Sequence, residues 1–129
     1  MGFLVELVCS RCGRRYEPSE NPLTCGSGDL GRLDIFYDYE AVKERLSKSV
    51  LEERRGGGVW RYWELLPVDL RYRVGLEEGG TPLLRAGRLA GELGIRDLYL
   101  KDETRNPTAS FKDRAMAIGV AKAVELGEE

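Results

Sequence analysis

Short apolar runs alternate with cysteine- and glycine-containing turns in the first third of the chain. Residues 3–8 (Phe-Leu-Val-Glu-Leu-Val) and 33–37 (Leu-Asp-Ile-Phe-Tyr) have the composition of β-strands. A module of about 35 residues buries too little apolar surface to be stable alone, so it normally needs a metal ion or a neighbouring segment. We therefore predict a small β module over residues 1–38 that depends on such support.

The spacing of apolar positions becomes helical after residue 38. Over residues 39–55, valine, leucine and valine at positions 42, 46 and 50 fall on one side of a helix, and charged residues cover the other. Glycines 56–58 end this helix. The aromatic run at 59–63 (Val-Trp-Arg-Tyr-Trp) has no basic surroundings, so it predicts a packed turn rather than a base-stacking surface.

Strand and helix patterns alternate from residue 83 onward. We predict short strands at 83–84 and 95–101, a helix at 86–93 between them, and a largely buried helix over the apolar run at 115–126. Glycines inside the helix at 86–93 predict that it packs closely on a neighbouring element. This order is typical of a parallel α/β layer. The predicted fold class is therefore α/β, with an incomplete parallel sheet in a partial domain over residues 39–129.

A parallel sheet normally has several strands and is covered on both faces. The last residues of the chain resemble a helix C-cap, the point at which a next strand would begin. We therefore expect the chain to be a truncated part of a larger domain. Apolar surface that such a part leaves uncovered favours self-association.

Composition and charge exclude several classes of function. The 129 residues carry a net charge of −2 without a basic stripe, so we expect no nucleic-acid partner. Residues 1–8 lack the features of a leader peptide and no long apolar run follows, so we expect a cytoplasmic protein with no membrane partner. Histidine is absent, which excludes Ser-His and Cys-His dyads and histidine metal ligands. Glutamine is also absent and arginine outnumbers lysine, a pattern that resembles heat-adapted (thermophile) proteins.

The three cysteines match most of a zinc ribbon. Cys9 and Cys12 have the spacing of one half, and Cys25 begins the other half, with Gly28 where a fourth cysteine is expected. Three thiolates leave a tetrahedral site open. Either Asp29 supplies an oxygen, a neighbouring chain supplies a ligand, or the site is vestigial. A Cys9–Cys12 disulfide or plain thiols are the remaining alternatives. The cysteines are thus candidate zinc ligands in a zinc-ribbon-like module.

Residues 106–114 (Asn-Pro-Thr-Ala-Ser-Phe-Lys-Asp-Arg) place a lysine at a predicted helix start. Ser110 and Asp113 resemble the two partners of a capping box, which puts Lys112 in the first helical turn. There we expect the helix macrodipole to disfavour a cation and the Asp113 carboxylate to favour one. Lys112 is then either an ordinary lysine that bends back into water, or a partly neutral amine able to form a Schiff base. The local pattern leaves both interpretations open.

Four stretches, taken together and in order, resemble the N-terminal part of the threonine synthase family. These are enzymes with pyridoxal 5'-phosphate as cofactor and a tryptophan-synthase-β-like fold, fold type II. The stretches are residues 9–16 (Cys-x-x-Cys-Gly…Tyr), 60–67 (Trp-Arg-Tyr…Leu-Leu-Pro), 78–83 (Glu-Gly-Gly-Thr-Pro-Leu) and 98–114. The resemblance implies that Lys112 forms the Schiff base with the cofactor and that Phe111 lies beside the cofactor ring. Ala109 replaces the glycine common in this family, which we expect to be a mild change.

The resemblance also implies a reaction, that of a carbon–oxygen lyase. The family converts O-phosphohomoserine, a small phosphorylated amino acid, and water to threonine and phosphate, with Lys112 moving protons. Groups that hold the cofactor hydroxyl, phosphate and ring nitrogen are expected outside this chain, so we expect the chain alone to bind the cofactor weakly and to be inactive. The alternatives are a related fold type II enzyme such as cysteate synthase, or a non-catalytic zinc-ribbon-like module that docks to a partner.

Overall fold

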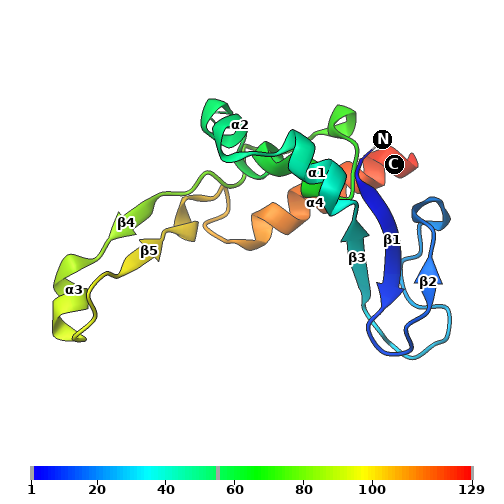
Figure 1. Ribbon diagram of the computed structural model, residues 1–129, viewed down its shortest axis with the longest axis horizontal. Helices are drawn as coiled ribbons and strands as arrows, with labels where there is room; N and C mark the ends of the chain where they lie inside the picture. Colours follow the sequence, from blue (N-terminus) through cyan, green and yellow to red (C-terminus); the bar gives the residue numbers. More distant parts are fainter. Residues whose placement is uncertain (1, 55, 129) are drawn as a thin grey trace.

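The computed structural model describes residues 2–54 and 56–128 (Figure 1). It has a mixed α/β fold with short sheets, as the sequence predicts at this coarse level. The strands and helices are, in chain order, β1 (Leu4–Cys9), β2 (Arg15–Tyr16), β3 (Leu33–Tyr37), α1 (Tyr39–Arg45), α2 (Lys48–Glu53), β4 (Leu83–Arg85), α3 (Gly87–Glu92), β5 (Tyr99–Lys101) and α4 (Lys112–Leu126). Short 3₁₀ helices connect several of them.

The first sheet contains three antiparallel strands in the order β2-β1-β3. Leu7 of β1 lies opposite Tyr16 of β2 on one side and opposite Ile35 of β3 on the other. The strands predicted at 3–8 and 33–37 are confirmed as β1 and β3. The sequence analysis did not predict β2, because two residues are too few to show an alternating pattern. A domain boundary at residue 38 stays a prediction.

The helix predicted over residues 39–55 is two helices in the described part, and residue 55 lies outside it. Leu46 adopts an extended conformation, and Ser47 then caps α2 by accepting a hydrogen bond from the backbone N–H of Val50 (3.2 Å). A serine that satisfies an unpaired helix N–H stabilises a new helix start. The single continuous helix was therefore a wrong prediction, and local capping is the reason.

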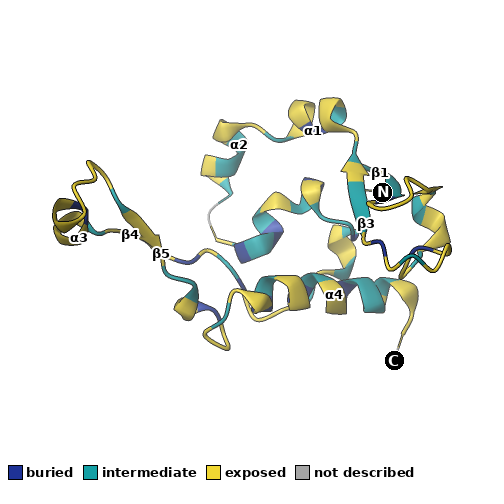
Figure 2. Ribbon diagram, turned by 90° about the horizontal axis from the view of Figure 1, so that it is seen from below, coloured by how far each residue is buried: buried dark blue, intermediate teal, exposed yellow. Residues whose placement is uncertain are grey.

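A small apolar core joins the 3₁₀ helix Gly58–Leu65 to α4. Trp60, Val68 and Ala121 are buried at its centre. The indole N–H of Trp60 donates to the carbonyl oxygen of Val74 (3.0 Å), so its polar atom is satisfied inside the core. The packed aromatic turn predicted at 59–63 is confirmed. Figure 2 shows α4 lying along this region with exposed and partly buried residues in alternation.

A buried ion pair ties α2 to the same 3₁₀ helix. Glu64 is 0% exposed, and its two carboxylate oxygens accept from Nη1 and Nη2 of Arg54 at 2.8 and 2.6 Å. Arg54 Nη1 also donates to the carbonyl oxygen of Arg61 (3.0 Å). Burial alone raises the pKa of a carboxyl group, but the bonds from Arg54 outweigh it and hold the pKa of Glu64 below its ordinary value. This pair therefore fastens the end of α2 to the 3₁₀ helix.

Strands β4 and β5 form an arm that projects from the rest of the chain (Figure 1). They pair antiparallel, with Leu84 opposite Leu100, because the segment between them, which contains α3, turns the chain back on itself. The incomplete parallel sheet that we predicted is not confirmed: the described residues contain no parallel pair. Nothing lies within 4 Å of the positions that side chains would occupy at Gly87 and Gly91. The prediction that this helix packs closely on a neighbour was therefore wrong.

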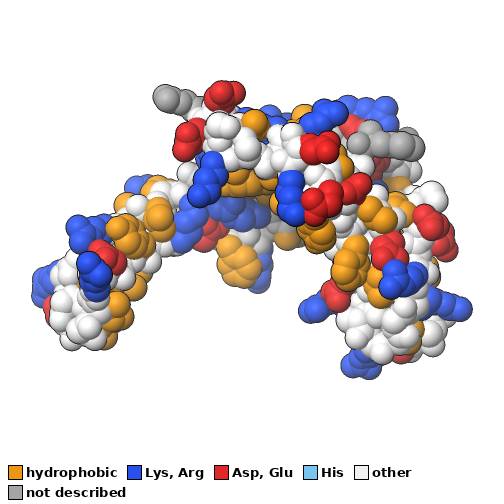
Figure 3. Space-filling view, in the orientation of Figure 1, with side chains coloured by type: hydrophobic (Ala, Val, Ile, Leu, Met, Phe, Trp, Pro, Cys, Tyr) orange, Lys and Arg blue, Asp and Glu red, His pale blue; other side chains and the backbone are white. Residues whose placement is uncertain are grey.

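Helix α4 is more exposed than its apolar sequence predicts. Met116 is 62% exposed, and Val120 and Val124 are also exposed on the helix. Its buried side chains are mainly small, Ala117 and Ala121. Figure 3 shows further apolar side chains along the β4–β5 arm. The largely buried helix was a wrong prediction, and self-association through such surfaces stays a prediction. Within residues 2–54 and 56–128, no helix is long and apolar enough to cross a membrane.

Candidate functional site

The segment that leads to Lys112 is attached at its start by Asn106, which is 5% exposed. Its side-chain oxygen accepts from the backbone N–H of Gly79 (2.9 Å). Its side-chain nitrogen donates to the carbonyl oxygen and to Oε2 of Glu103 (3.0 and 2.9 Å). One buried amide therefore joins the turn that contains Glu103 to Gly79, which lies 27 positions before Asn106 in the sequence.

Asp113 attaches the other end of the same segment. It is 8% exposed, and its carboxylate accepts hydrogen bonds from the backbone N–H (2.7 Å) and the hydroxyl of Thr108. Asp113 therefore does not complete a capping box with Ser110, and Phe111 is the N-cap residue. Ser110 Oγ still accepts from the backbone N–H of Lys112 (3.2 Å). As predicted, Lys112 lies in the first turn of α4, where it is the first helical residue.

Ala109 lies at the turn of this segment with a φ of 57°. For a residue with a β-carbon, this left-handed conformation is unfavourable by about 1–2 kcal/mol, whereas glycine adopts it freely. Alanine in place of the family's glycine, which we expected to be mild, therefore strains the backbone three residues before Lys112. The hydrogen bonds at Asn106 and Asp113 hold the loop in this conformation.

Arg114 binds the first turn of α4 to the preceding loop. Its guanidinium donates to both carboxylate oxygens of Glu103 (2.8 Å each) and to the hydroxyl of Thr81 (3.1 Å), which itself donates to Glu103. The bonds from Arg114 and Thr81 lower the pKa of Glu103 to about 2. A β-carbon on Gly79 would lie 2.6 Å from Nη1 of Arg114 and 2.8 Å from the backbone nitrogen of Val59, so only glycine fits this close approach. Residues 79–81, 103 and 114 thus form one polar clamp.

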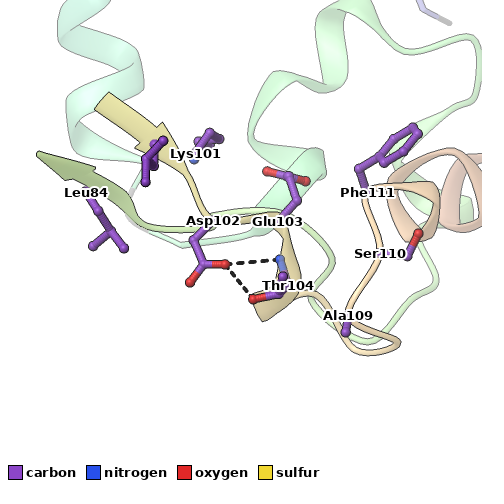
Figure 4. Close-up of a pocket in the computed structure, with 9 residues that line it drawn as sticks. Leu84, Lys101, Asp102, Glu103, Thr104, Ala109, Ser110 and Phe111 are labelled. Atoms are coloured by element: carbon purple, nitrogen blue, oxygen red, sulfur yellow. Dashed lines mark hydrogen bonds between the residues drawn. The ribbon is translucent and has the colours of Figure 1, made fainter. Parts of the chain in front are cut away.

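An open pocket of about 420 Å³ lies beside the loop. In Figure 4 residues of β4 and β5 and the turn after β5 lie on one side of it, and the loop with Phe111 lies on the other. The lining residues are Leu84, Leu100, Lys101, Asp102, Glu103, Thr104, Ala109, Ser110 and Phe111. Lys112 is exposed and does not line this pocket, although its neighbour does. The structure therefore places the two candidate residues differently, one at the pocket and one next to it.

The three cysteines meet in a second cluster within the β module, far from the β4–β5 arm (Figure 1). All three are free thiols, so the Cys9–Cys12 disulfide is not formed. Cys12 Sγ lies 3.6 Å from Cys25 Sγ, and the Cys9 thiol donates to Asp29 Oδ2 (3.4 Å). Hydrogen bonds from Ser27 and Tyr16 lower the pKa of the Cys25 thiol to about 7. The four side chains form a group that can hold a metal ion.

Comparisons with known proteins find similarity over most of this chain. Residues 74–129 match the family of pyridoxal-phosphate dependent enzymes. Threonine synthase from Methanocaldococcus jannaschii is 52% identical over 122 residues, which are 94% of this chain and 29% of that protein. Threonine synthase from Methanosarcina acetivorans is 47% identical over 124 residues, which are 96% and 29% of the two chains. The chain is therefore similar to threonine synthases over nearly all of its own length. No solved structure matches.

The similarity covers only part of the length of each matched threonine synthase. This chain spans 29% of the length of each of the two threonine synthases described above. Threonine synthase from Bacillus sp. strain ULM1 is 47% identical over 70 residues, which are 54% of this chain and 20% of that protein. The segment that matches the pyridoxal-phosphate dependent enzymes contains the pocket-lining residues and Lys112.

The sequence assigned no role to the clamp around Arg114. Its members lie within two of the stretches that carried the resemblance, residues 78–83 and 98–114. Charged and amide side chains within such runs are the sequence signal of buried polar contacts. Their partners are up to 33 positions apart in the sequence, so the pairing itself requires the structure.

Proposed function

We propose that this chain is part of a pyridoxal-phosphate dependent threonine synthase, in which Lys112 is the residue that holds the cofactor covalently. The observation that carries the proposal is the arrangement of residues 106–114, which sets Phe111 at a pocket and Lys112 at the first position of α4. The similarity to threonine synthases over nearly the whole chain supports it. The substrates in this proposal are O-phosphohomoserine and water, and the products are threonine and phosphate.

The pocket fits part of such a cofactor. About 420 Å³ lies within the range of ligand pockets, roughly 300–1,000 Å³. The phenyl ring of Phe111 and the side chains of Leu84 and Leu100 supply apolar surface suited to an aromatic ring. When bound, pyridoxal phosphate supplies an electron sink for the charge left after a proton is removed from the substrate. Phe111 would pack against the ring, and Lys112 would provide the amine.

Lys112 has two tasks in this proposal, and its position suits both. A covalent partner of the cofactor must have a free amine, and a proton carrier must reach the substrate carbons. Lys112 is exposed at the first position of α4, so its amine is accessible to a cofactor beside the helix start. The direction of the Lys112 backbone is set by Asp113 and Arg114, whose side chains point back to Thr108 and Glu103. These two are positioning residues in the proposal.

We also propose that the chain by itself does not catalyse the reaction. The residues that line the pocket include one lysine, and this Lys101 donates to the carbonyl oxygen of Thr81. Among the described residues that line it, none is an arginine or a glycine. A phosphate group is normally held by such side chains or by backbone N–H groups of a glycine-rich turn. Those contacts would come from protein outside these residues.

A chimera tests the proposal. The chain replaces the matched 122 residues of the Methanocaldococcus jannaschii relative, and the product is assayed for phosphate release and threonine formation from O-phosphohomoserine. We expect activity from the chimera and none from its Lys112→Ala variant. The matched control is Lys122→Ala, because Lys122 lies on the same helix ten positions later and pairs with Glu125. We expect this control to remain active.

Two results would contradict the proposal. One is a folded chimera that forms no threonine, and the other is full activity after Lys112→Ala. Reduction of the cofactor-loaded chimera with borohydride, followed by peptide mass analysis, gives a readout independent of turnover. We expect the cofactor mass on Lys112 and not on Lys122. The unfused chain under the same conditions should show no selective labelling of Lys112.

A further inference from the structure

The ligand atoms of Cys9, Cys12, Cys25 and Asp29 all lie within 4.8 Å of one another. A zinc–thiolate bond of about 2.3 Å gives sulfur–sulfur edges of about 3.8 Å in a tetrahedron, and a zinc–oxygen bond of about 2.0 Å gives sulfur–oxygen edges of about 3.5 Å. The two measured edges are 3.6 Å between Cys12 and Cys25 and 3.4 Å between Cys9 and Asp29. These two edges therefore match a tetrahedral site with three sulfur donors and one oxygen donor.

Two tight turns present these donors. In the first, the backbone N–H of Arg11 donates to Cys9 Sγ (3.4 Å), and Gly13, with a φ of 72°, donates its N–H to the Cys9 carbonyl oxygen (3.0 Å). In the second, the N–H of Gly31 donates to Asp29 Oδ1 (2.8 Å). That bond orients the carboxylate and leaves Oδ2 facing Cys9. Backbone N–H groups thus hold a sulfur ligand and an oxygen ligand in place without a metal ion.

We propose that Cys9, Cys12, Cys25 and Asp29 bind one structural Zn²⁺ ion, with Asp29 as the fourth ligand in the place that the missing cysteine leaves. Thiolate sulfur favours Zn²⁺ over magnesium or calcium, and four protein ligands leave no open position for a reacting water. Each thiol releases its proton to solvent as it binds the metal. Arg11, whose Nη1 donates to the Asp29 carbonyl oxygen (2.8 Å), contributes positive charge beside a negatively charged ligand set.

The surrounding loop shows what the ion does for the fold. Over residues 17–32, which connect β2 to β3, Cys25 and Gly31 are the buried residues. Leu23 and Leu30 are 92% and 89% exposed, so this loop has no apolar core of its own. A β-carbon on Gly31 would lie 2.3 Å from Cys9 Sγ, which shows how closely the loop approaches the sulfur. The metal therefore takes the place of a core by fastening this loop to the end of β1.

X-ray absorption spectroscopy of the zinc-loaded chain tests the ligand set directly. We expect one zinc per chain after dialysis, with a first shell of three sulfurs and one oxygen. No retained zinc, or a shell of four sulfurs from a ligand shared between chains, would overturn the proposal. Because this measurement uses the unaltered chain, it does not depend on whether a variant folds.

Substitution of the fourth ligand supplies the second test. We expect Asp29→Asn to lower zinc affinity by more than about tenfold in competition with a chelator. The control is Asp34→Asn, a neighbouring aspartate that pairs with Arg32 instead, and we expect it to leave zinc affinity unchanged. Asp29→Cys should keep zinc and change the first shell to four sulfurs. Equal zinc affinities for Asp29→Asn and Asp34→Asn would overturn the role of Asp29. These zinc measurements do not test the reaction proposed for Lys112.

Discussion

The carboxylate of Asp113 accepts two hydrogen bonds from Thr108, one from the backbone N–H at 2.7 Å and one from the hydroxyl. This relationship closes the loop that precedes α4 into a ring of six residues with Lys112 inside it. The ring sets the direction of the Lys112 backbone through side chains that perform no chemistry. A second contact, between Arg114 and Glu103, ties the same turn to the loop after β5. The position of the candidate lysine thus depends on a polar scaffold.

The first prediction concerns this ring. Asp113→Asn keeps the shape of the side chain but replaces one acceptor by a donor, so one bond to Thr108 is lost in a buried place. We expect the free energy of unfolding to fall by about 1–3 kcal/mol, measured by urea denaturation. Amide hydrogen exchange should become faster at Thr108. The control is Asp102→Asn, which alters the similar but more exposed bonds to Thr104. An equal loss of stability in both variants would show that the Asp113–Thr108 contact stabilises the protein no more than the exposed Asp102–Thr104 contact.

The second prediction concerns Ala109, whose φ is 57°. Glycine removes about 1–2 kcal/mol of backbone strain but increases the entropy of the unfolded chain by about 0.4–1 kcal/mol. We therefore expect Ala109→Gly to raise the free energy of unfolding by up to about 1 kcal/mol in urea denaturation. Ala115→Gly, at an exposed position in α4, should lower it by about 1 kcal/mol. The same sign for both substitutions would contradict the strain at Ala109.

The third prediction concerns the pH dependence contributed by Glu103. Bonds from Arg114 and Thr81 lower the pKa of Glu103 to about 2, below the value of about 4.3 expected in an unfolded chain. A lowered folded-state pKa means that the contribution to stability is complete above pH 5 and is lost between about pH 5 and pH 2. We expect wild type to unfold at higher urea than Glu103→Gln at pH 6, and the difference to shrink toward pH 2.

The control for that series is Glu52→Gln, which removes an exposed carboxylate on α2. We expect its urea midpoint to follow that of wild type at every pH. If the gap between wild type and Glu103→Gln stayed constant from pH 6 to pH 2, ionisation of Glu103 would not be its cause.

The fourth prediction concerns the buried pair of Arg54 and Glu64. Glu64→Gln removes the charge partner of Arg54 at a buried position while the Arg54 side chain stays 28% exposed, so we expect a loss of about 1–3 kcal/mol in the free energy of unfolding. The comparison is Glu92→Gln, which breaks the exposed pair with Arg88 and should cost no more than about 1 kcal/mol. Near-ultraviolet circular dichroism should report disorder around Trp60 only in the first variant. Similar losses of unfolding free energy for the two variants would show that burial of Glu64 does not strengthen its pair with Arg54.

The sequence predicted most elements because their signals are local. Strands β1 and β3, the short strand β4 and the start of α4 near Lys112 follow from apolar runs, turns and capping residues. The interruption at Ser47 escaped detection because the apolar spacing continues across it. The exposure of Met116 also escaped, because an apolar sequence shows that a side chain favours burial but not which surface covers it.

The chemistry of this protein was readable from residue types, and its geometry was not. The Cys9–Cys12 spacing and the position of Lys112 at a helix start were readable because each pattern lies within a few residues, and Cys25 follows in a similar turn. The closeness of Asp29 to Cys9 depends on how two loops approach each other across the β module. The clamp of Thr81, Glu103 and Arg114 depends on contacts up to 33 residues apart. Long-range contacts form only when the chain folds back on itself, so the fold decides that Asp29 lies beside Cys9 and which residues support the lysine.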